Sequence, residues 1–320
     1  MQKRFFKICL LGFVVGTAAS AFAQRQNVYY YKSNGTHALT ADSADYVQMI
    51  TETDSTSKIY DIKEYYRNGK LKLIGKTSVT AGVWLEGQCI SFYPDGKRQH
   101  MGVYKNNQPV GDVYNYYPNG KIYTIEKIEN NRIVIEAGND TTGVPVITNG
   151  DGYLKNYNGF YNVSSEGYLR SGIKDGEWKG GFFWQGDAIA YTETYKKGML
   201  VSGQAVRNGI VYPYTVHSKH AGYKTGDAAL HKFLDRNLAY PLEALKDGTQ
   251  GVASVSLKIN ADGSISDIEA ITLTNIDLTG AIIHTLPLSA GDWEPQRYYG
   301  MPIATKYIVS VNFGIITKKF

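Results

Sequence analysis

One phrase recurs three times in this sequence: Tyr65-Tyr66-Arg67-Asn68-Gly69-Lys70-Leu71, Phe92-Tyr93-Pro94-Asp95-Gly96-Lys97-Arg98 and Tyr116-Tyr117-Pro118-Asn119-Gly120-Lys121-Ile122. In each copy an aromatic pair is followed, after one residue, by Asn-Gly-Lys or Asp-Gly-Lys. The turn glycines lie 27 and then 24 residues apart, a spacing typical of a solenoid or rolled sheet. Each copy therefore predicts a strand that ends in aromatic residues, a tight turn, and a strand that begins with a basic residue.

Further turn signals punctuate the chain from about Val28 to Tyr214. Asn-Gly and Asp-Gly pairs tolerate the positive φ angles that two-residue hairpin turns require. We therefore expect a mostly β repeat region, a meander of antiparallel hairpins over residues 24–215. The 26 tyrosines of the chain suit such strands, since a ring can pack while its hydroxyl stays hydrated. The pairs begin at Asn34, Asn68, Asp95, Asn119, Asn149, Asp151, Asp175 and Asn208.

The pattern changes to that of a small α+β domain after a linker at residues 216–225. Apolar residues recur at helical spacing after Asp227, which is predicted to cap that helix. Alternating apolar residues then predict half-buried strands. We expect two helices on an antiparallel sheet over residues 226–320. The remaining predicted elements are a short helix at 242–246, strands at 253–259 and 265–271, a helix at 278–286 capped by Asp277, and a closing strand at 305–313.

The C-terminal landmarks resemble the C-terminal domain of the energy transducer TonB, over about residues 226–314. Several spaced landmarks in the right order carry this resemblance. They are Tyr240, Pro241, Ala244, Gly251, Asp262, Gly263, Trp293, Pro295, Gly300 and Pro302.

The resemblance implies a periplasmic domain that touches outer-membrane receptors. It implies that an extended peptide of the receptor, or of another envelope partner, adds as a strand to the sheet edge. The expected edge comprises Thr305, Lys306, Tyr307, Ile308, Val309, Ser310, Val311, Asn312 and Phe313.

The recurring phrase itself resembles the MORN-like repeats of bacterial envelope and antitoxin-like proteins. Their signature is an aromatic pair followed by Pro-Asn-Gly-Lys, which the copy at Tyr116–Ile122 contains. We expect the tyrosines to pack from one repeat to the next. A platform for a glycan or a peptide is the alternative, because aromatic rings also stack on sugar faces.

The first 23 residues predict a secretory signal peptide. Basic residues precede an apolar run that is short for a membrane span, and Ala21-Phe22-Ala23 offers a cleavage site. We expect export to the periplasm or cell envelope and no membrane span after cleavage. A retained anchor is the alternative. Without Lys3, Arg4 and Lys7 the formal net charge falls from +5 to +2, which gives no argument for a nucleic-acid partner.

Nothing in the sequence points to catalysis, a metal or another cofactor. The hydrolase pattern GxSxG and the phosphate-loop pattern are absent. His217, His220 and His231 are interpreted as solvated, and Cys89 as a buried, inert thiol. Five carboxylates are placed at solvent-facing or turn-flanking positions: Glu64, Glu86, Asp112, Glu126 and Glu177.

Three functions remain open. The favoured one is a non-enzymatic envelope protein whose C-terminal domain binds an extended peptide by strand addition beside a repeat scaffold. The second is a component of energy transduction in TonB-dependent transport. It is disfavoured because the chain has nine scattered prolines and no proline-rich spacer. The third places protein or glycan binding in the repeats. Pairing with a second copy of the chain stays open.

Overall fold

The computed structural model describes residues 25–315 except 53–55, 130–131, 160–161 and 274. The predicted signal peptide lies outside the described residues. The chain divides into two compact units. Unit 1 holds the described residues up to Ile133 together with Asn139–Val144, and unit 2 holds Val134–Gly138 and the described residues from Pro145 onward.

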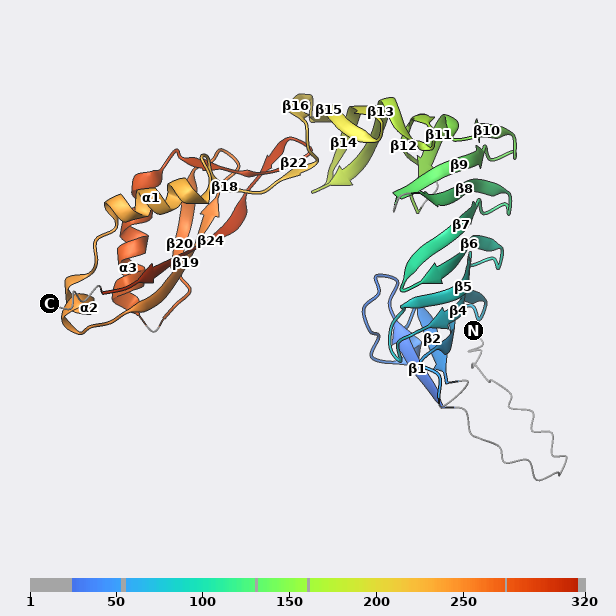
Figure 1. The fold of residues 1–320 in the computed structure, drawn as a ribbon, viewed down its shortest axis with the longest axis horizontal. Coiled ribbons are helices and arrows are strands. Elements are labelled where there is room, and N and C mark those ends of the chain that lie inside the picture. The colour runs from blue at the N-terminus through green and yellow to red at the C-terminus, as the bar shows by residue number, and fades with distance from the viewer. Residues whose placement is uncertain (1–24, 53–55, 130–131, 160–161, 274, 316–320) are drawn as a thin grey trace, which may run out of the picture. The chain divides into compact units, whose positions relative to one another are not determined.

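Sixteen strands in the described part of the chain form one antiparallel sheet in which each strand pairs with the next in sequence (Figure 1). The predicted meander is confirmed. The strands are β1 (Gln26–Tyr31), β2 (Tyr46–Thr51), β3 (Tyr60–Tyr66), β4 (Leu71–Thr77), β5 (Leu85–Phe92), β6 (Arg98–Lys105), β7 (Gln108–Tyr116), β8 (Ile122–Glu129), β9 (Arg132–Asn139), β10 (Pro145–Thr148), β11 (Asp151–Tyr157), β12 (Val163–Arg170), β13 (Ile173–Trp184), β14 (Asp187–Lys196), β15 (Met199–Arg207) and β16 (Ile210–Tyr214).

The recurring phrases form turns of three residues, not the two-residue turns expected. In the first copy Gly69 has φ 80°, whereas Asn68 is not among the residues with positive φ. The Gly69 N–H donates to the Tyr66 carbonyl, and the Tyr66 N–H to the Lys70 carbonyl. This bonding is that of a hairpin whose glycine forms a bulge after the turn. The copies at Gly96 and Gly120 repeat both bonds.

True two-residue turns lie elsewhere. Asn149-Gly150 and Asn208-Gly209 have positive φ at both residues, as such turns require. Two of the predicted turns are wrong, because Asp151-Gly152 begins β11 and Asp175-Gly176 lies inside β13. The chain turns before β13 at Ser171-Gly172 instead, where both φ angles are positive.

Side chains of the phrases bind the next turn along unit 1. The second aromatic residue donates its hydroxyl to a carbonyl one repeat ahead: Tyr66 to Phe92 at 2.7 Å, Tyr93 to Tyr116 at 2.5 Å and Tyr117 to Asn139 at 2.9 Å. The phrase lysines reach forward in the same way, from Lys70 to Asp95 and from Lys97 to Pro118. The phrase is therefore a ladder of hydrogen bonds from turn to turn.

The turn at Asp140-Thr141-Thr142-Gly143 ends this ladder and was not predicted. Its Asp140 carboxylate accepts from the N–H groups of Thr142 and Val144. Asn119 donates to the Thr141 carbonyl at 2.7 Å, as the earlier asparagine of the phrase donates to Pro94. The segment lacks the aromatic pair and the lysine, so the phrase could not be recognised there.

Burial in unit 1 was predicted correctly for one side chain, Cys89, and wrongly for another, Glu64. Cys89 is a free, buried thiol, as predicted, and burial raises its pKa to about 11. Glu64 was expected near solvent, yet it is 2% exposed and accepts from Gln48 Nε2 at 2.8 Å and from Lys72. The Glu64 carboxylate can be buried because the Gln48 amide and the Lys72 ammonium donate hydrogen bonds to it in place of water.

The C-terminal part of unit 2 is a small α+β fold, as predicted. Its main sheet has the order β20-β19-β24, and three α-helices and one 3-10 helix accompany the strands (Figure 1). The elements are β17 (Ser218–Lys219), β18 (Gly222–Tyr223), α1 (Asp227–Asn237), α2 (Leu242–Lys246), β19 (Gly251–Ile259), β20 (Ile265–Ala270), α3 (Ile276–Thr285), the 3-10 helix η2 (Leu286–Ser289), β21 (Trp293–Glu294), β22 (Gln296–Tyr298), β23 (Met301–Ile303) and β24 (Thr305–Phe313).

An apolar core holds this fold together. One face of β19 supplies fully buried side chains, among them Val255 and Leu257, and α1 and α3 cover that face with Leu234 and Ile282. Burying each such side chain stabilises the fold by about 1.5–3 kcal/mol. The period-two and helical spacings in the sequence thus predicted the core face correctly.

Both predicted helix caps are wrong. Gly226 precedes α1, so Asp227 is its first residue and makes no capping bond. Asn275 precedes α3, and Asp277 lies inside that helix. The segment at residues 216–225 also contains two strands, β17 and β18, which pair with β22 and β21.

Candidate functional site

The strand β24 ends one side of the small sheet. It pairs with β19 along its whole length, from Gly251 opposite Phe313 to Ile259 opposite Thr305, without a register shift. Among the described residues no strand pairs with its other side. The bounds of β24 equal those of the predicted edge strand, Thr305–Phe313.

The register shows which main-chain groups of β24 face outward. Ser254 of β19 directs its N–H to Thr272 and its carbonyl to Ile271, on the side away from β24. Ser254 opposite Ser310 is therefore a pair without main-chain hydrogen bonds, and their hydroxyls approach to 2.8 Å as such close pairs allow. Since strand groups alternate in direction, the N–H and C=O groups that face outward are those of Lys306, Ile308, Ser310 and Asn312.

The same four residues carry the exposed side chains of the strand. The intervening residues turn toward the core, where Val309 is 3% exposed, whereas Ile308 is 58% exposed. Tyr307 also faces the core side and donates its hydroxyl to Asp227 at 3.2 Å, and burial raises the pKa of that hydroxyl. The free edge thus offers unpaired main-chain groups at every second residue, each flanked by an accessible side chain.

The opposite edge of the sheet, β20, differs from β24. Its pairing with β19 shifts register between Ser256 and Lys258, and Asp267 adopts a φ of 49°. A bulge and charged side chains are the usual means by which an edge strand is kept from pairing further. β20 carries both, with carboxylates at Asp267 and Glu269. β24 is the straighter edge and the better template for an added strand.

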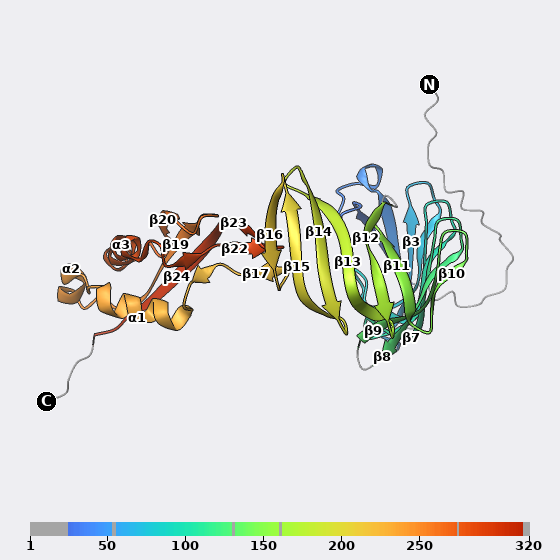
Figure 2. The ribbon, with the colours of Figure 1, turned by 90° about the horizontal axis from the view of Figure 1, so that it is seen from above.

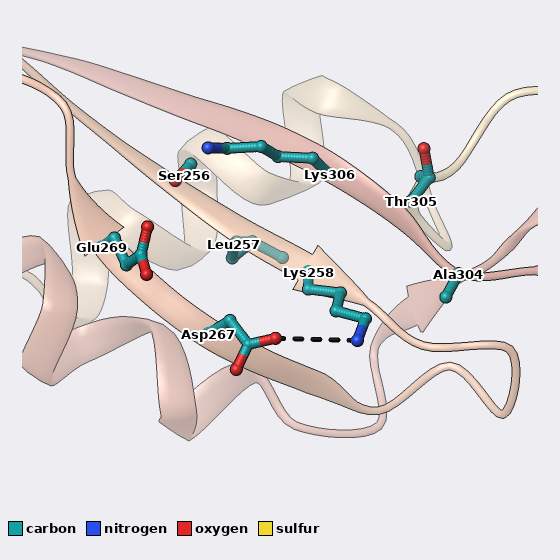
Figure 3. Close-up of a pocket in the computed structure, with 8 residues that line it drawn as sticks. All are labelled: Ser256, Leu257, Lys258, Asp267, Glu269, Ala304, Thr305 and Lys306. Atoms are coloured by element: carbon teal, nitrogen blue, oxygen red, sulfur yellow. Dashed lines mark ion pairs between the residues drawn. The ribbon is translucent and has the colours of Figure 1, made fainter.

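A shallow hollow lies on the outer face of the small sheet, near the start of β24 (Figure 3). Lys258 and Lys306 stand opposite each other in the register, and Lys258 forms an ion pair with Asp267 at 3.7 Å. In Figure 3 the Lys306 side chain extends toward Ser256. The hollow is lined by Ser256, Leu257, Lys258, Asp267, Glu269, Ala304, Thr305 and Lys306.

The landmark residues build the sheet and do not lie on the free edge. Trp293 is 1% exposed and donates its ring N–H to Ser289 at 2.9 Å. A side chain at Gly263, where φ is 84°, would come within 2.8 Å of the Trp293 carbonyl. Pro295 lies beside the same glycine, so Asp262-Gly263 and Trp293 meet at one corner.

Three other landmarks, Tyr240, Pro241 and Gly251, lie at the opposite end of the fold. Tyr240 donates its hydroxyl to the Thr249 carbonyl at 2.6 Å, and its ring meets Phe313 edge to face. Pro241 precedes α2, and Gly251 begins β19 with φ 129°. These contacts anchor the end of β24 and the start of β19.

The histidines do not gather into a metal site. No group of three potential ligands occurs in the described part of the chain. His217 is not a solvated linker residue, as its ring nitrogen contacts the buried Glu193 and its ring packs on Tyr214 and Tyr299. Sequence reasoning missed this cluster, since its members lie far apart along the chain.

Comparisons with known proteins agree with both resemblances. Residues 236–315 match the family described as Gram-negative bacterial TonB protein C-terminal. Residues 85–106 and 109–130 match the MORN repeat variant family. No curated protein matches the chain significantly.

The matched spans coincide with the structural features above. The TonB span contains β19, β20 and β24. The two MORN spans contain β5, β6, β8 and all of β7 except Gln108, with two of the three recurring phrases. Both families are non-catalytic. No described helix combines the length and the apolar character needed to cross a membrane. The chain therefore contains a TonB C-terminal domain at residues 236–315 and MORN-variant repeats at residues 85–130.

Proposed function

We propose that the free edge of β24 binds an extended peptide of an outer-membrane receptor, or of another envelope protein, by β-strand addition. The observation that carries the proposal is the row of outward main-chain groups at Lys306, Ile308, Ser310 and Asn312 on an unshifted edge strand. An added strand would satisfy these groups, and the exposed side chains beside them would select among peptides. The TonB-family match to residues 236–315 supports this partner class.

A matched pair of variants at one position tests the main-chain contact. Ile308→Pro removes an outward N–H, and proline is tolerated on an edge strand where that group faces solvent. Ile308→Ala keeps the N–H and removes only the side chain. The ligands are synthetic peptides from the periplasmic plug of outer-membrane receptors, and their affinity is measured by isothermal titration calorimetry. We expect Ile308→Pro to weaken their binding at least tenfold and Ile308→Ala to weaken it by less than about threefold.

Two results would count against the proposal. One is that no plug peptide binds the unaltered chain at millimolar concentration. The other is equal loss of binding in both Ile308 variants, which would place the recognition in the side chain. Circular dichroism of each variant checks that the small sheet remains folded.

Energy transduction is the second candidate, favoured by the family match at residues 236–315. It requires an N-terminal membrane anchor that survives in the mature protein. We propose instead a signal peptide that is removed after Ala23, which leaves an exported protein in the periplasm or cell envelope. The mass of the mature protein decides: a chain that begins at Gln24 has lost the segment that such an anchor would need.

A further inference from the structure

A hairpin of the C-terminal domain projects away from that domain's own core. Strands β22 and β23 form it, with Tyr298 opposite Met301 and a two-residue turn at Tyr299 and Gly300, whose φ angles are 49° and 75°. Met301 is 1% exposed. It is buried in a cluster with Ile189, Ala205 and Tyr214, which belong to the last strands of the large sheet. Both views place β22 beside β16 (Figure 2).

Aromatic rings of the last strands surround Tyr299. Its ring centroid lies 4.9 Å from that of Phe182, 5.3 Å from those of Tyr191 and Tyr214, and 4.8 Å from that of His217. These are the spacings of favourable tilted and edge-to-face aromatic pairs. Tyr299 thus fills an aromatic pocket formed by β13, β14, β16 and the segment after β16.

Glycines make room for the pocket on the face of the sheet. A side chain at Gly203 would come within 2.4 Å of the Tyr214 ring, and one at Gly180 within 2.5 Å of the Tyr191 hydroxyl. The Tyr214 and Tyr191 side chains therefore lie directly over glycine backbone of the sheet. Glu193 lies beneath these rings and is 2% exposed. Its carboxylate accepts hydrogen bonds from the hydroxyls of Tyr195 at 2.9 Å and Tyr214 at 2.8 Å.

The backbone of the hairpin turn is held as well. The Tyr299 N–H donates to the His217 carbonyl at 2.7 Å. A side chain at Gly300 would come within 2.7 Å of the Pro213 carbonyl, so the turn lies against the edge of β16. β22 also pairs with β17 at Ser218 and Lys219. Side-chain, main-chain and steric contacts thus converge on one hairpin.

We infer that strands β13 to β16 act as a mount for the C-terminal domain, with the Tyr299 pocket as the joint. The sequence predicts a boundary after residue 215. The joint carries contacts across that boundary, so that it fixes the C-terminal domain to the last strands of the large sheet. These last strands of the large sheet then have a function of their own, which is to hold the domain that carries β24. This inference does not depend on peptide binding.

Limited proteolysis of the full chain tests the joint. Trypsin cleaves after Lys219 and Lys224, which lie in or beside the paired strands β17 and β18. Cleavage there requires local opening, so its rate reports the open population. We expect Tyr299→Ala and Phe182→Ala each to raise the rate of this cleavage at least tenfold. We expect the double variant to stay within about threefold of the single ones, because both substitutions break the same contact.

Phe183→Ala is the matched control. Phe183 is the neighbour of Phe182 on the same strand, but it is 83% exposed on the other face of the sheet. Its substitution is expected to leave the cleavage rate unchanged within twofold. An unchanged rate in Tyr299→Ala would overturn the inference. So would cleavage that spreads equally through residues 226–315, since the contact would then maintain the fold of the domain and not its attachment.

Discussion

The recurring turns of unit 1 and the small sheet of unit 2 are stabilised in opposite ways. Each turn of unit 1 is tied to the next by a few polar side chains, such as Tyr66 and Lys70, that reach carbonyl groups one repeat ahead. The small sheet instead rests on a continuous apolar core under α1 and α3, and no strand of the described residues pairs with the outer side of β24. Stability is divided among many small contacts in the first case and concentrated in the second.

This difference predicts where a single substitution matters. Removing one of the turn-to-turn hydrogen bonds of unit 1 leaves the other turn-to-turn bonds in place. Breaking the main-chain pairing between β19 and β24 disturbs the apolar core beneath the small sheet. The following predictions test this contrast, beginning with the largest effect.

Val309→Pro is expected to destabilise the small sheet by about 3 kcal/mol. The Val309 N–H points to β19, because Val309 lies opposite Val255 in a hydrogen-bonded pair, and its side chain is 3% exposed. The substitution leaves a buried carbonyl of β19 without its partner and removes apolar contacts. Urea unfolding followed by circular dichroism measures the loss. A change below about 1 kcal/mol would contradict the deduced direction of the strand groups.

Alkaline pH is expected to destabilise unit 1 through Cys89. Burial raises the pKa of this thiol to about 11, above its ordinary value near 9. Below pH 9 both the folded and the unfolded chain hold the proton. Between about pH 9 and 11 only the folded chain does, so the free energy of unfolding falls by about 1.4 kcal/mol per pH unit. Urea midpoints from pH 8 to 10.5 measure the slope.

Cys89→Ala supplies the comparison for the pH series. It removes the titrating thiol, so its stability should fall less steeply over the same range, although it is lower at neutral pH because a buried group is missing. Equal slopes for Cys89→Ala and the unaltered chain would assign the effect to other groups instead, such as Tyr31, whose pKa is also raised by burial.

Tyr66→Phe is expected to cost about 1 kcal/mol. It removes the 2.7 Å bond from the Tyr66 hydroxyl to the Phe92 carbonyl while the ring stays in place. Tyr65→Phe at the adjacent position is the control, as the described structure shows no hydrogen bond of that hydroxyl, and it should change stability by only a few tenths of a kcal/mol. A loss as large as that of Val309→Pro would mean that the ladder acts as one cooperative body.

Ile308→Pro is expected to have the smallest effect on stability, below about 1 kcal/mol. The Ile308 N–H faces away from β19, and the side chain is 58% exposed. Thermal unfolding of this variant beside Val309→Pro compares two adjacent positions that differ chiefly in direction. Similar losses of stability in the two variants would show that the N–H groups of Ile308 and Val309 do not point in opposite directions.

Local sequence patterns predicted most of the fold, but not the features that depend on a residue elsewhere in the chain. The alternation around Tyr307 and Val309 gave the bounds of β24 correctly, because burial on one face imposes a period of two. The same alternation does not reveal which N–H groups face outward. That direction depends on the position of Ser254 on another strand, more than 50 residues away.

The errors have equally specific causes. Asp175-Gly176 has the composition of a turn, but Ser171-Gly172 turns the chain four residues earlier, which leaves no room for a second turn. Asp227 and Asp277 have the chemistry of helix caps, yet Gly226 and Asn275 occupy the capping positions. The Tyr299 pocket joins residues from four segments, so no window of the sequence contains its pattern.

The forward reach of the lysines gives the repeats a direction and a simple rule for growth. The Lys70 stem lies 3.7 Å from the position of a side chain on Gly96, and Lys97 stands in the same way toward Gly120. Each copy therefore requires of its successor only carbonyl oxygens and a glycine, which almost any copy provides. Gene duplication could lengthen such an array one unit at a time without redesign of its neighbours. An added copy would thus leave these contacts of its neighbours intact, whereas the final strands of the sheet fit one particular hairpin.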